Sequence, residues 1–358
     1  MTLGMPSIEV VFRQLAATAV RRSSRGVLAL VVRDNTEGTP EIATYATYLD
    51  IKEGAYSAEN MELIKQAFTG LPAKVIVIKQ TSGGTTEALK EALDGILFNW
   101  LAIATESSVD QEAAATYVQA RNKSKKGKKV KALVYGNVTV DDIHVVRFTT
   151  EKAVLEDGEV DGWKVLPRIA GVLAGLPMTR SATYYELSDI KSVTEPGDMD
   201  KAVDEGNLFL FNDEGTVRIA RAVNSLKTVG KTYTEDMKSI AIVEAMDLME
   251  EDIYTTFKND YLGKYKNSYD NQSLFIAAVN GYFKALAREE ILDAGFKNIA
   301  GVDVEAQRGA WVAAGKAEAS EWDELTVKKN TFKRNVYLSG NVKILDAMED
   351  LFFPITMM

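Results

Sequence analysis

The hydrophobic pattern of the chain begins its regular part with a continuous apolar run. Residues 27–32 read VLALVV, which is typical of a strand buried on both faces of a sheet. Helical and strand patterns then alternate, and Ser57 and Gly70 stand where a helix cap and a helix end are expected. Ser108 and Gln111 have capping-box spacing before a later helix. After the first strand, the predicted elements are helix 57–72, strand 74–79, helix 85–95, strand 96–104, helix 112–121 and strand 130–136.

Helix-then-strand units in this order predict an α/β fold with a partly parallel sheet flanked by helices. The second half of the chain has a different pattern. Residues 208–223 read as a hairpin with NDEG as its turn, and long helical patterns follow at about 235–259 and 272–294. We therefore expect α+β architecture overall, with a C-terminal domain of long helices and a small sheet. The predicted division is an N-terminal arm and hinge at 1–25, an α/β domain at 26–190, a helix-rich domain with the hairpin at 191–335, and a C-terminal strand arm at 336–358.

Both ends of the chain have the alternating pattern of extended strands. Leu351, Phe353 and Ile355 share one face of the C-terminal strand. Pro354 has no N–H to donate, so this segment fits an edge or an arm better than a central strand. Near the other end, the apolar residues that alternate are Ile8, Val10 and Phe12. Chain ends fray unless something holds them, so each predicted strand needs a partner, in the same chain or in another.

Composition narrows the possible functions. The chain has 358 residues, of which 46% are hydrophobic and 26% charged, and this is ordinary for a folded protein. Its net charge of −9 disfavours nucleic acid and anionic membranes as partners. The absence of cysteine excludes disulfides, thiolate metal sites and cysteine nucleophiles. There is no long apolar run for membrane insertion and no secretory signal, so we expect the chain to be made and assembled in a cytoplasm.

Two features could carry enzyme chemistry, each with a simpler alternative. His144 is the single histidine, so it is either a structural or surface residue or an isolated catalytic one. The glycines at 83 and 84 lie in TSGGTTEALK, between a strand and a helix, where a phosphate-binding loop would lie. The loop lacks both common phosphate-loop motifs, so a plain connection is the alternative.

Two charged segments are also open to a functional and a structural interpretation. Residues 121–131 hold seven basic residues, which would suit nucleic acid, an acidic protein partner or a solvated loop. Aromatic residues for base stacking are missing there, which favours the last two. The possible partner contacts in this segment are Lys125, Lys126, Lys128 and Lys129. On the helix 235–259, Glu244, Asp247 and Glu251 lie away from the apolar stripe, and we expect them on a solvated face rather than in acid–base catalysis. No catalytic residues, metal or cofactor are predicted.

Several stretches, in order along nearly the whole chain, resemble the contractile tail sheath proteins of myophages, defective prophages and phage-tail-like bacteriocins. They are GMPSIEVVFRQLAATAVRRSSRGVLALVVRD near the N-terminus, AGVLAGLPMTRSATYYEL at 170–187, GNLFLFNDEGTVRIARAVNSL at 206–226, VDVEAQR at 302–308, and NVKILDAMEDL at 341–351. The apolar ending LFFPITMM departs from the more polar ending expected for this family.

The resemblance implies a structural protein with no active site. Family members assemble as a helical homo-oligomeric sheath, built as stacked hexameric rings around a tail tube protein, with baseplate and tail terminator proteins at its ends. The sheath contracts to drive the tube through a cell envelope. The resemblance also implies that both chain ends add strands to a small sheet in neighbouring subunits, here through Ile8, Val10, Phe12, Val342, Ile344, Leu351, Phe353 and Ile355. Hinges for these arms are expected in RRSSRG and at a Gly340-Asn341 turn. The alternatives are an α/β enzyme binding a small molecule or nucleotide, and a sheath of a secretion-type injection machine.

Overall fold

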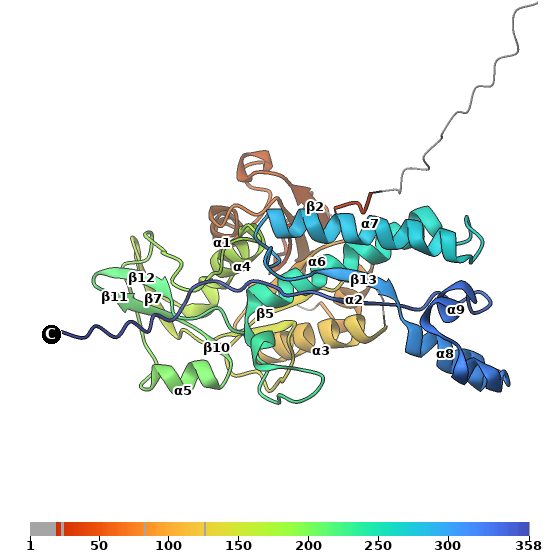
Figure 1. The fold of residues 1–358 in the computed structure, drawn as a ribbon. Coiled ribbons are helices and arrows are strands. Elements are labelled where there is room, and N and C mark those ends of the chain that lie inside the picture. The colour runs from red at the N-terminus through yellow and green to blue at the C-terminus, as the bar shows by residue number, and fades with distance from the viewer. Residues whose placement is uncertain (1–18, 23–24, 82–83, 125–126, 358) are drawn as a thin grey trace, which may run out of the picture.

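The computed structural model of the chain describes residues 19–22, 25–81, 84–124 and 127–357, and its largest element is a seven-stranded sheet (Figure 1). The strand order is β10-β6-β5-β4-β1-β3-β2, and every neighbouring pair is parallel except β2 with β3 at one edge. The predicted partly parallel sheet is confirmed. Its strands are β1 (Val27–Arg33), β2 (Ile42–Tyr45), β3 (Lys74–Gln80), β4 (Trp100–Ile103), β5 (Lys131–Tyr135), β6 (Val145–Phe148) and β10 (Asn207–Leu208).

Helices cover both faces of this sheet. On one face α1 (Ala58–Thr69) and α4 (Leu166–Gly175) pack against the even-numbered residues of β1, and on the other α2 (Thr86–Asp94) and α3 (Ser108–Ser124) pack against the odd-numbered ones. The predicted burial of β1 on both faces is therefore confirmed, as is Ser57 as the cap of α1. The predicted cap of α3 is wrong by one residue, because the Ser107 hydroxyl, not that of Ser108, accepts the Asp110 N–H at 3.3 Å.

Helices α1 and α4 cross so closely that only glycine fits at the contact. A Cβ on Gly171 would lie 2.0 Å from the Ala67 carbonyl oxygen, and one on Gly175 would lie 2.1 Å from the carbonyl oxygen of Gly70. Such distances are far below van der Waals contact, so these glycines in the AGVLAG stretch are required by packing. The crossing fixes α4 on the sheet.

Smaller sheets extend the body beyond this layer (Figure 1). The predicted hairpin is present as β11 and β12, and its turn residues Glu214 and Gly215 both have positive φ, as type I′ turns require. It is shorter than predicted, because Leu208 belongs to the large sheet instead. The bounds are β7 (Lys152–Leu155), β8 (Gly158–Asp161), β9 (Ser192–Val193), β11 (Leu210–Asp213), β12 (Thr216–Ile219) and helix α5 (Met199–Asp204).

The C-terminal part contains the two predicted long helices, α6 (Ile240–Thr256) and α7 (Tyr269–Arg288). A separate apolar core lies between them and the segment that leads to the C-terminus. The remaining elements are a π-helical turn (Phe257–Tyr261), β13 (Ile299–Val302), α8 (Val304–Ala313), α9 (Glu324–Lys329), β14 (Leu338–Asn341), and 3-10 turns at Tyr48–Asp50, Gly162–Lys164, Glu235–Lys238 and Ala317–Glu321. Among the described residues, no helix combines the length and apolar character needed to cross a membrane.

The domain limits predicted at residues 25, 190 and 335 stay predictions. The segment after residue 190 contributes β9 and β10 to sheets that begin before it.

Candidate functional site

The C-terminal segment runs in extended form across the whole subunit (Figure 1). It is the dark blue segment that follows α9, passes α6, and continues beyond the β11–β12 hairpin (Figure 1). Its first part is bonded to the same chain through odd-numbered residues. The Tyr337 carbonyl accepts the Asp303 N–H at 3.0 Å, the Lys343 carbonyl accepts the Asp293 N–H at 2.8 Å, and the Leu345 N–H donates to Ile291 at 3.0 Å.

The even-numbered residues of this segment present an open strand edge. Gly340 lies opposite Ala300 of β13, and both backbone groups of Ala300 bond to the side chain of Asn280 on α7. The backbone N–H and C=O groups of Ala300 therefore point away from β14. In an antiparallel pair, the N–H and C=O groups of the opposite residue, Gly340, must then point away from β13. The same alternation turns the N–H and C=O groups of Leu338, Val342 and Ile344 outward. Among the described residues, no backbone partner outside the local strand pairing engages this edge.

Side chains of the open edge point toward the subunit core. Leu338, Val342 and Ile344 pack against the apolar core between α6 and α7, whereas Ser339, Asn341 and Lys343 are exposed. The predicted turn at Gly340-Asn341 is wrong, because both residues belong to β14 and pair with β13.

Acidic side chains anchor the next part of the segment. Asp346 accepts a 3.1 Å hydrogen bond from Ser239, and Glu349 accepts one of 2.8 Å from Ser181. Arg221 pairs with Glu349 at 3.5 Å and with Asp350 at 2.5 Å. Three separate stretches of the chain thus hold residues 346–350. We did not predict these contacts from the sequence, since nothing in the spacing of Ser181, Arg221 and Ser239 connects them to the C-terminus.

Beyond this anchor the chain end is free of the body. The large apolar side chains there are almost fully exposed: Leu351 87%, Phe352 90%, Phe353 73%, Ile355 74% and Met357 92%. A row of exposed apolar residues of this kind is what a partner surface covers. The two groups of predicted exchange residues are therefore separate, with Val342 and Ile344 at the open edge and Leu351, Phe353 and Ile355 on the free end. Ile8, Val10 and Phe12 lie outside the described residues.

The root of the N-terminal segment is fastened to the C-terminal helices. The Arg21 N–H donates to the Thr256 hydroxyl at 3.1 Å and its guanidinium pairs with Asp260, while Arg22 pairs with Glu289 after α7. Arg25 pairs with Glu244 of α6. In the predicted RRSSRG hinge, the arginines before and after the two serines are thus bound to the C-terminal helices and the residues that follow them. Ser23 and Ser24 themselves lie outside the described residues.

The predicted solvated face of α6 is wrong. Asp247 and Glu251 are only 5% and 8% exposed, because α6 packs this face against the sheet. The buried Lys131 ammonium lies 3.1 Å from the carboxylate of Glu244 and 2.5 Å from that of Asp247. The Trp100 indole N–H also donates to Glu244 at 2.9 Å. These acids neutralise two cations from earlier in the chain, Lys131 of β5 and Arg25 before β1.

Burial and charge pairing shift the pKa values of this cluster. Burial lowers the pKa of Lys131 to about 8 despite the attraction of Asp247. Burial alone would raise the pKa of Asp247, but Lys131 and His144 outweigh it and bring that pKa well below its usual range. Burial would lower the pKa of His144, yet its contacts with Asp142 and Asp247 raise it. The imidazole Nε2 lies 3.0 Å from Asp247, which supports the structural interpretation of this histidine.

Within the basic run at 121–131, three described lysines, Lys128, Lys129 and Lys131, face α6. Arg121 and Lys131 are buried, and Lys128 and Lys129 pair with Glu251 and Glu250 at 3.4 and 3.5 Å. The expected solvated loop is therefore wrong for these residues. Lys125 and Lys126 lie outside the described residues, so contact of this run with another protein stays a prediction.

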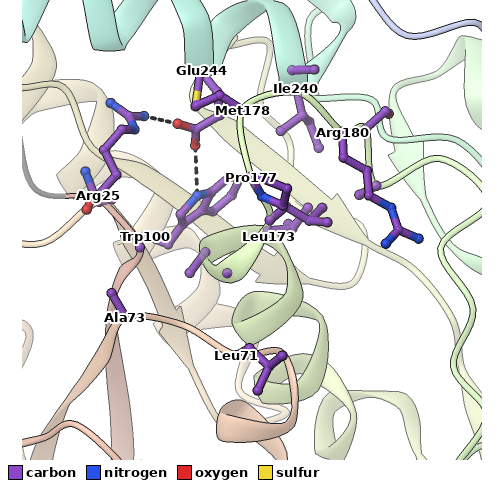
Figure 2. A pocket seen from close by; sticks show the side chains of 18 residues that line it. Arg25, Leu71, Ala73, Trp100, Leu173, Pro177, Met178, Arg180, Ile240 and Glu244 are labelled. Carbon is purple, nitrogen blue, oxygen red and sulfur yellow. Dashed lines mark hydrogen bonds and ion pairs between the residues drawn. The ribbon is translucent and has the colours of Figure 1, made fainter. Parts of the chain in front are cut away.

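A cavity of about 330 Å³ lies between α4, α6 and the strand ends, and Figure 2 shows the side chains that line it. Two of its charged groups already pair with each other, since the Glu244 carboxylate joins Arg25 to the Trp100 indole, and a third, Arg180, stacks on Tyr185. The glycine-rich loop lies elsewhere, and the Arg33 guanidinium donates to the carbonyls of Thr81 and Gly84, both at 3.3 Å. This contact favours a plain connection there. In the described part of the chain, no group of three or more acidic or histidine side chains is arranged to hold a metal.

Comparison with known proteins agrees with this geometry. The family model of the phage tail sheath C-terminal domain matches residues 232–357. The tail sheath protein of Clostridium phage phiCD119 is 31% identical over 364 residues, which cover 99% of both chains. The helical sheath of the anti-feeding prophage, in its contracted state, has the same fold with a TM-score of 0.69 and 13% identity, covering 99% of both chains. A sheath tail protein from Listeria innocua gives 0.67 and 14%, covering 82% of this chain and 92% of its own.

A sheath relative that is nearly one-third identical over the full length confirms the family indicated by the sequence motifs. The same chain has the exposed C-terminal end and the open strand edge described above. This chain belongs to the family of contractile tail sheath proteins.

Proposed function

We propose that this chain works as a sheath subunit whose free C-terminal end joins a second copy by strand addition. The observation that carries this proposal is that one subunit contains both an exposed apolar chain end and an open strand edge. The end beyond Asp350 exposes its apolar side chains, and none of the strands that the structure describes pairs with the even-numbered edge at 338–344. A donor and an acceptor on one chain form a head-to-tail contact, which repeats into an open helix when its rotation does not close.

The energy of such a joint is substantial. A seven-residue antiparallel overlap forms about eight backbone hydrogen bonds, which contribute about 0.5–1.5 kcal/mol each. Burial of Leu351, Phe353 and Ile355 adds roughly 1.5–3 kcal/mol per side chain. The opposing cost is the ordering of the arm, about 1–2 kcal/mol per residue. The terms are of similar size, so an arm exchanges when many subunits are already aligned rather than between isolated subunits.

The proposed role is mechanical. Subunits surround a tail tube in an extended helix and slide, as nearly rigid bodies, into a shorter and wider one when a baseplate triggers them. Contacts between globular faces are remade in this step, while the strand joints persist. The buried pairs between α6 and the α/β domain support rigid-body motion, because Lys131, Glu244 and Asp247 connect the two parts inside each subunit. No catalytic step or cofactor enters this scheme.

The partners and location follow from the same role. We propose that the sheath is a helical homo-oligomer of stacked hexameric rings, in contact with tail tube, baseplate and tail terminator proteins, within a phage tail or tail-like particle built in a bacterial cytoplasm. The N-terminal arm, with Ile8, Val10 and Phe12, is a second strand donor in this proposal. Lys125 and Lys126, with Lys128 and Lys129, remain candidate contacts with a charged partner.

The experiment is electron microscopy of the purified protein at matched concentration. Full-length chain is expected to form striated tubes, and a variant that ends at Asp350 is expected to remain small, because it keeps the anchor and lacks the donor. Equal tube formation by both chains would overturn the strand-addition role of the C-terminus. Soluble monomer from both, under every assembly condition, would also contradict it.

The alternative function is an α/β enzyme that binds a small molecule or nucleotide. It requires saturable nucleotide binding near Gly84, which calorimetry with ATP and GTP would detect. The second alternative, the sheath of a secretion-type machine, usually consists of two different proteins. In the proposed role, this chain alone should form tubes without a second sheath protein.

A further inference from the structure

We infer the register and direction of the strand joint: the free C-terminal end of a second copy pairs antiparallel with the open edge, with Leu351 opposite Ile344 and Met357 opposite Leu338. This inference rests on the proposed strand addition and adds the alignment of the two strands. It follows from three independent observations on the donor, the acceptor and the anchor.

Pro354 decides which side of the donor faces the acceptor. In a strand, successive residues direct their N–H and C=O groups to opposite sides. Because Pro354 has no N–H, the even-numbered residues of 351–357 are suited to the side without a neighbour. The odd-numbered residues therefore bond to the acceptor, and they carry the apolar row Leu351, Phe353, Ile355 and Met357.

The acceptor decides the direction. Its outward backbone groups belong to even-numbered residues 338–344, whose side chains lie on the core face. In antiparallel pairing, a hydrogen-bonded residue lies directly opposite its partner, so the apolar donor residues lie beside Leu338, Val342 and Ile344. In parallel pairing, a residue bonds to the two neighbours of the one opposite it. That arrangement would put the same donor residues beside the exposed Ser339, Asn341 and Lys343.

The anchor decides the register. Contacts of Ser181, Ser239 and Arg221 hold the chain through Asp350, so seven described residues, 351–357, are free. The open edge between residues 338 and 344 also contains seven. Full overlap gives the pairs Leu351 with Ile344, Phe353 with Val342, Ile355 with Gly340, and Met357 with Leu338. Every hydrogen-bonded pair is then apolar or glycine.

The cysteine-free sequence permits a direct test by disulfide trapping. Opposite residues of a pair without mutual hydrogen bonds have Cα atoms about 4.5 Å apart, and disulfides accept about 4.4–6.8 Å. Two double variants report the inferred alignment, Ser339→Cys with Thr356→Cys and Lys343→Cys with Phe352→Cys. Two report the parallel one, Ser339→Cys with Leu351→Cys and Lys343→Cys with Ile355→Cys. Each is assembled under reducing conditions, checked for tubes by microscopy, oxidised, and run on a non-reducing gel.

The expected result is a ladder of covalent multimers from the first two variants and monomer from the last two. Mixing chains with the single changes Ser339→Cys and Thr356→Cys should give dimers and no longer products, which shows that the link joins two copies. A ladder from the parallel pairs alone would overturn the inferred direction. Tubes from all four variants without any ladder would overturn the acceptor edge while leaving the sheath role intact, whereas failure of the unmodified chain to form tubes would count against the proposed function itself.

Discussion

The Ser181 hydroxyl donates a 2.8 Å hydrogen bond to the Glu349 carboxylate, across 168 residues of sequence. This contact connects the loop after α4 to the anchored part of the C-terminal segment, residues 346–350. Arg221 binds the same carboxylate and that of Asp350, so the point at which the chain leaves its subunit is defined by side chains rather than by the backbone.

Replacement of Arg221 with alanine should loosen the anchor without unfolding the subunit. Its guanidinium is partly exposed, and such pairs contribute about 0–1 kcal/mol, so global stability should change by less than about 1 kcal/mol. Proteolytic cleavage within residues 346–350 should become up to about fivefold faster, because a loss of about 1 kcal/mol shifts the local opening equilibrium by that factor. Arg180→Ala is the matched control, since that arginine stacks on Tyr185 and does not touch the anchor. An unchanged cleavage rate in the Arg221 variant would show that the anchor is held by other groups.

Replacement of Phe353 with aspartate should block assembly and leave the monomer unaffected. The side chain is 73% exposed in the subunit, so its change should move the melting temperature very little, whereas a buried joint would contain an unpaired charge. Light scattering measures assembly and calorimetry measures unfolding. Thr356→Asp changes the opposite face and should impair assembly less. A large fall in monomer melting temperature would mean that Phe353 packs within its own chain.

Replacement of Asp247 with asparagine should be strongly destabilising. The change leaves the buried Lys131 without its nearest carboxylate, and removal of one partner of a buried pair costs about 3–5 kcal/mol. Urea unfolding of the monomeric Asp350-terminated chain measures this value. Glu250→Gln is the control, because the Glu250 carboxylate is solvent-accessible and its pair with Lys129 contributes about 0–1 kcal/mol. Equal effects of the two changes would show that the buried cluster contributes no more to the free energy of unfolding than a surface ion pair does.

His144 should give the subunit a measurable pH dependence. Asp142 and Asp247 face the imidazole and raise its pKa above the ordinary 6.5, against burial and the nearby Lys131. The folded state therefore holds this proton more tightly than the unfolded state, and the resulting stabilisation is complete below pH 6.5 and disappears as pH rises through the raised pKa. The stability difference between the natural chain and His144→Gln should be larger at pH 5.5 than at pH 9. A difference that is constant with pH would exclude a contribution from imidazole protonation.

The glycine contact between α1 and α4 predicts opposite effects at two helical glycines. Gly171→Ala would place a methyl group 2.0 Å from the Ala67 carbonyl oxygen and should destabilise by about 1–3 kcal/mol. Gly281→Ala on α7 meets no atom within 4 Å and should stabilise by about 0.5–1 kcal/mol through helix propensity. Thermal unfolding of both variants measures the contrast. Similar shifts in both would mean that the helices separate easily.

Local signals in the sequence were sufficient for most of the fold. The apolar run at 27–32, the Ser57 cap and the spacing from Ile240 to Phe257 each depend on neighbouring residues, and each gave the element that the structure contains. The exposed row after Asp350 was also predictable, because alternation and Pro354 are local features.

Contacts between distant segments were not predictable in this way. Helical periodicity correctly placed Glu244 and Asp247 away from the apolar stripe, but it does not reveal that Lys131 and Arg25 cover that face. Gly340-Asn341 resembled a turn because both residues favour turns, and pairing with β13 overrode this preference. The anchor at Ser181 and Arg221 depends on tertiary proximity alone.

The alternation of inward and outward backbone groups along residues 337–345 has a mechanical consequence. The strand that would receive a neighbour is bonded on its other side to β13 and to the loop before it, and β13 is in turn secured to α7 by Asn280. Tension along an added strand would load several hydrogen bonds simultaneously in shear, and would reach a long helix instead of a flexible loop. A subunit could then turn through a large angle while the strand joint continues to transmit force to the next subunit.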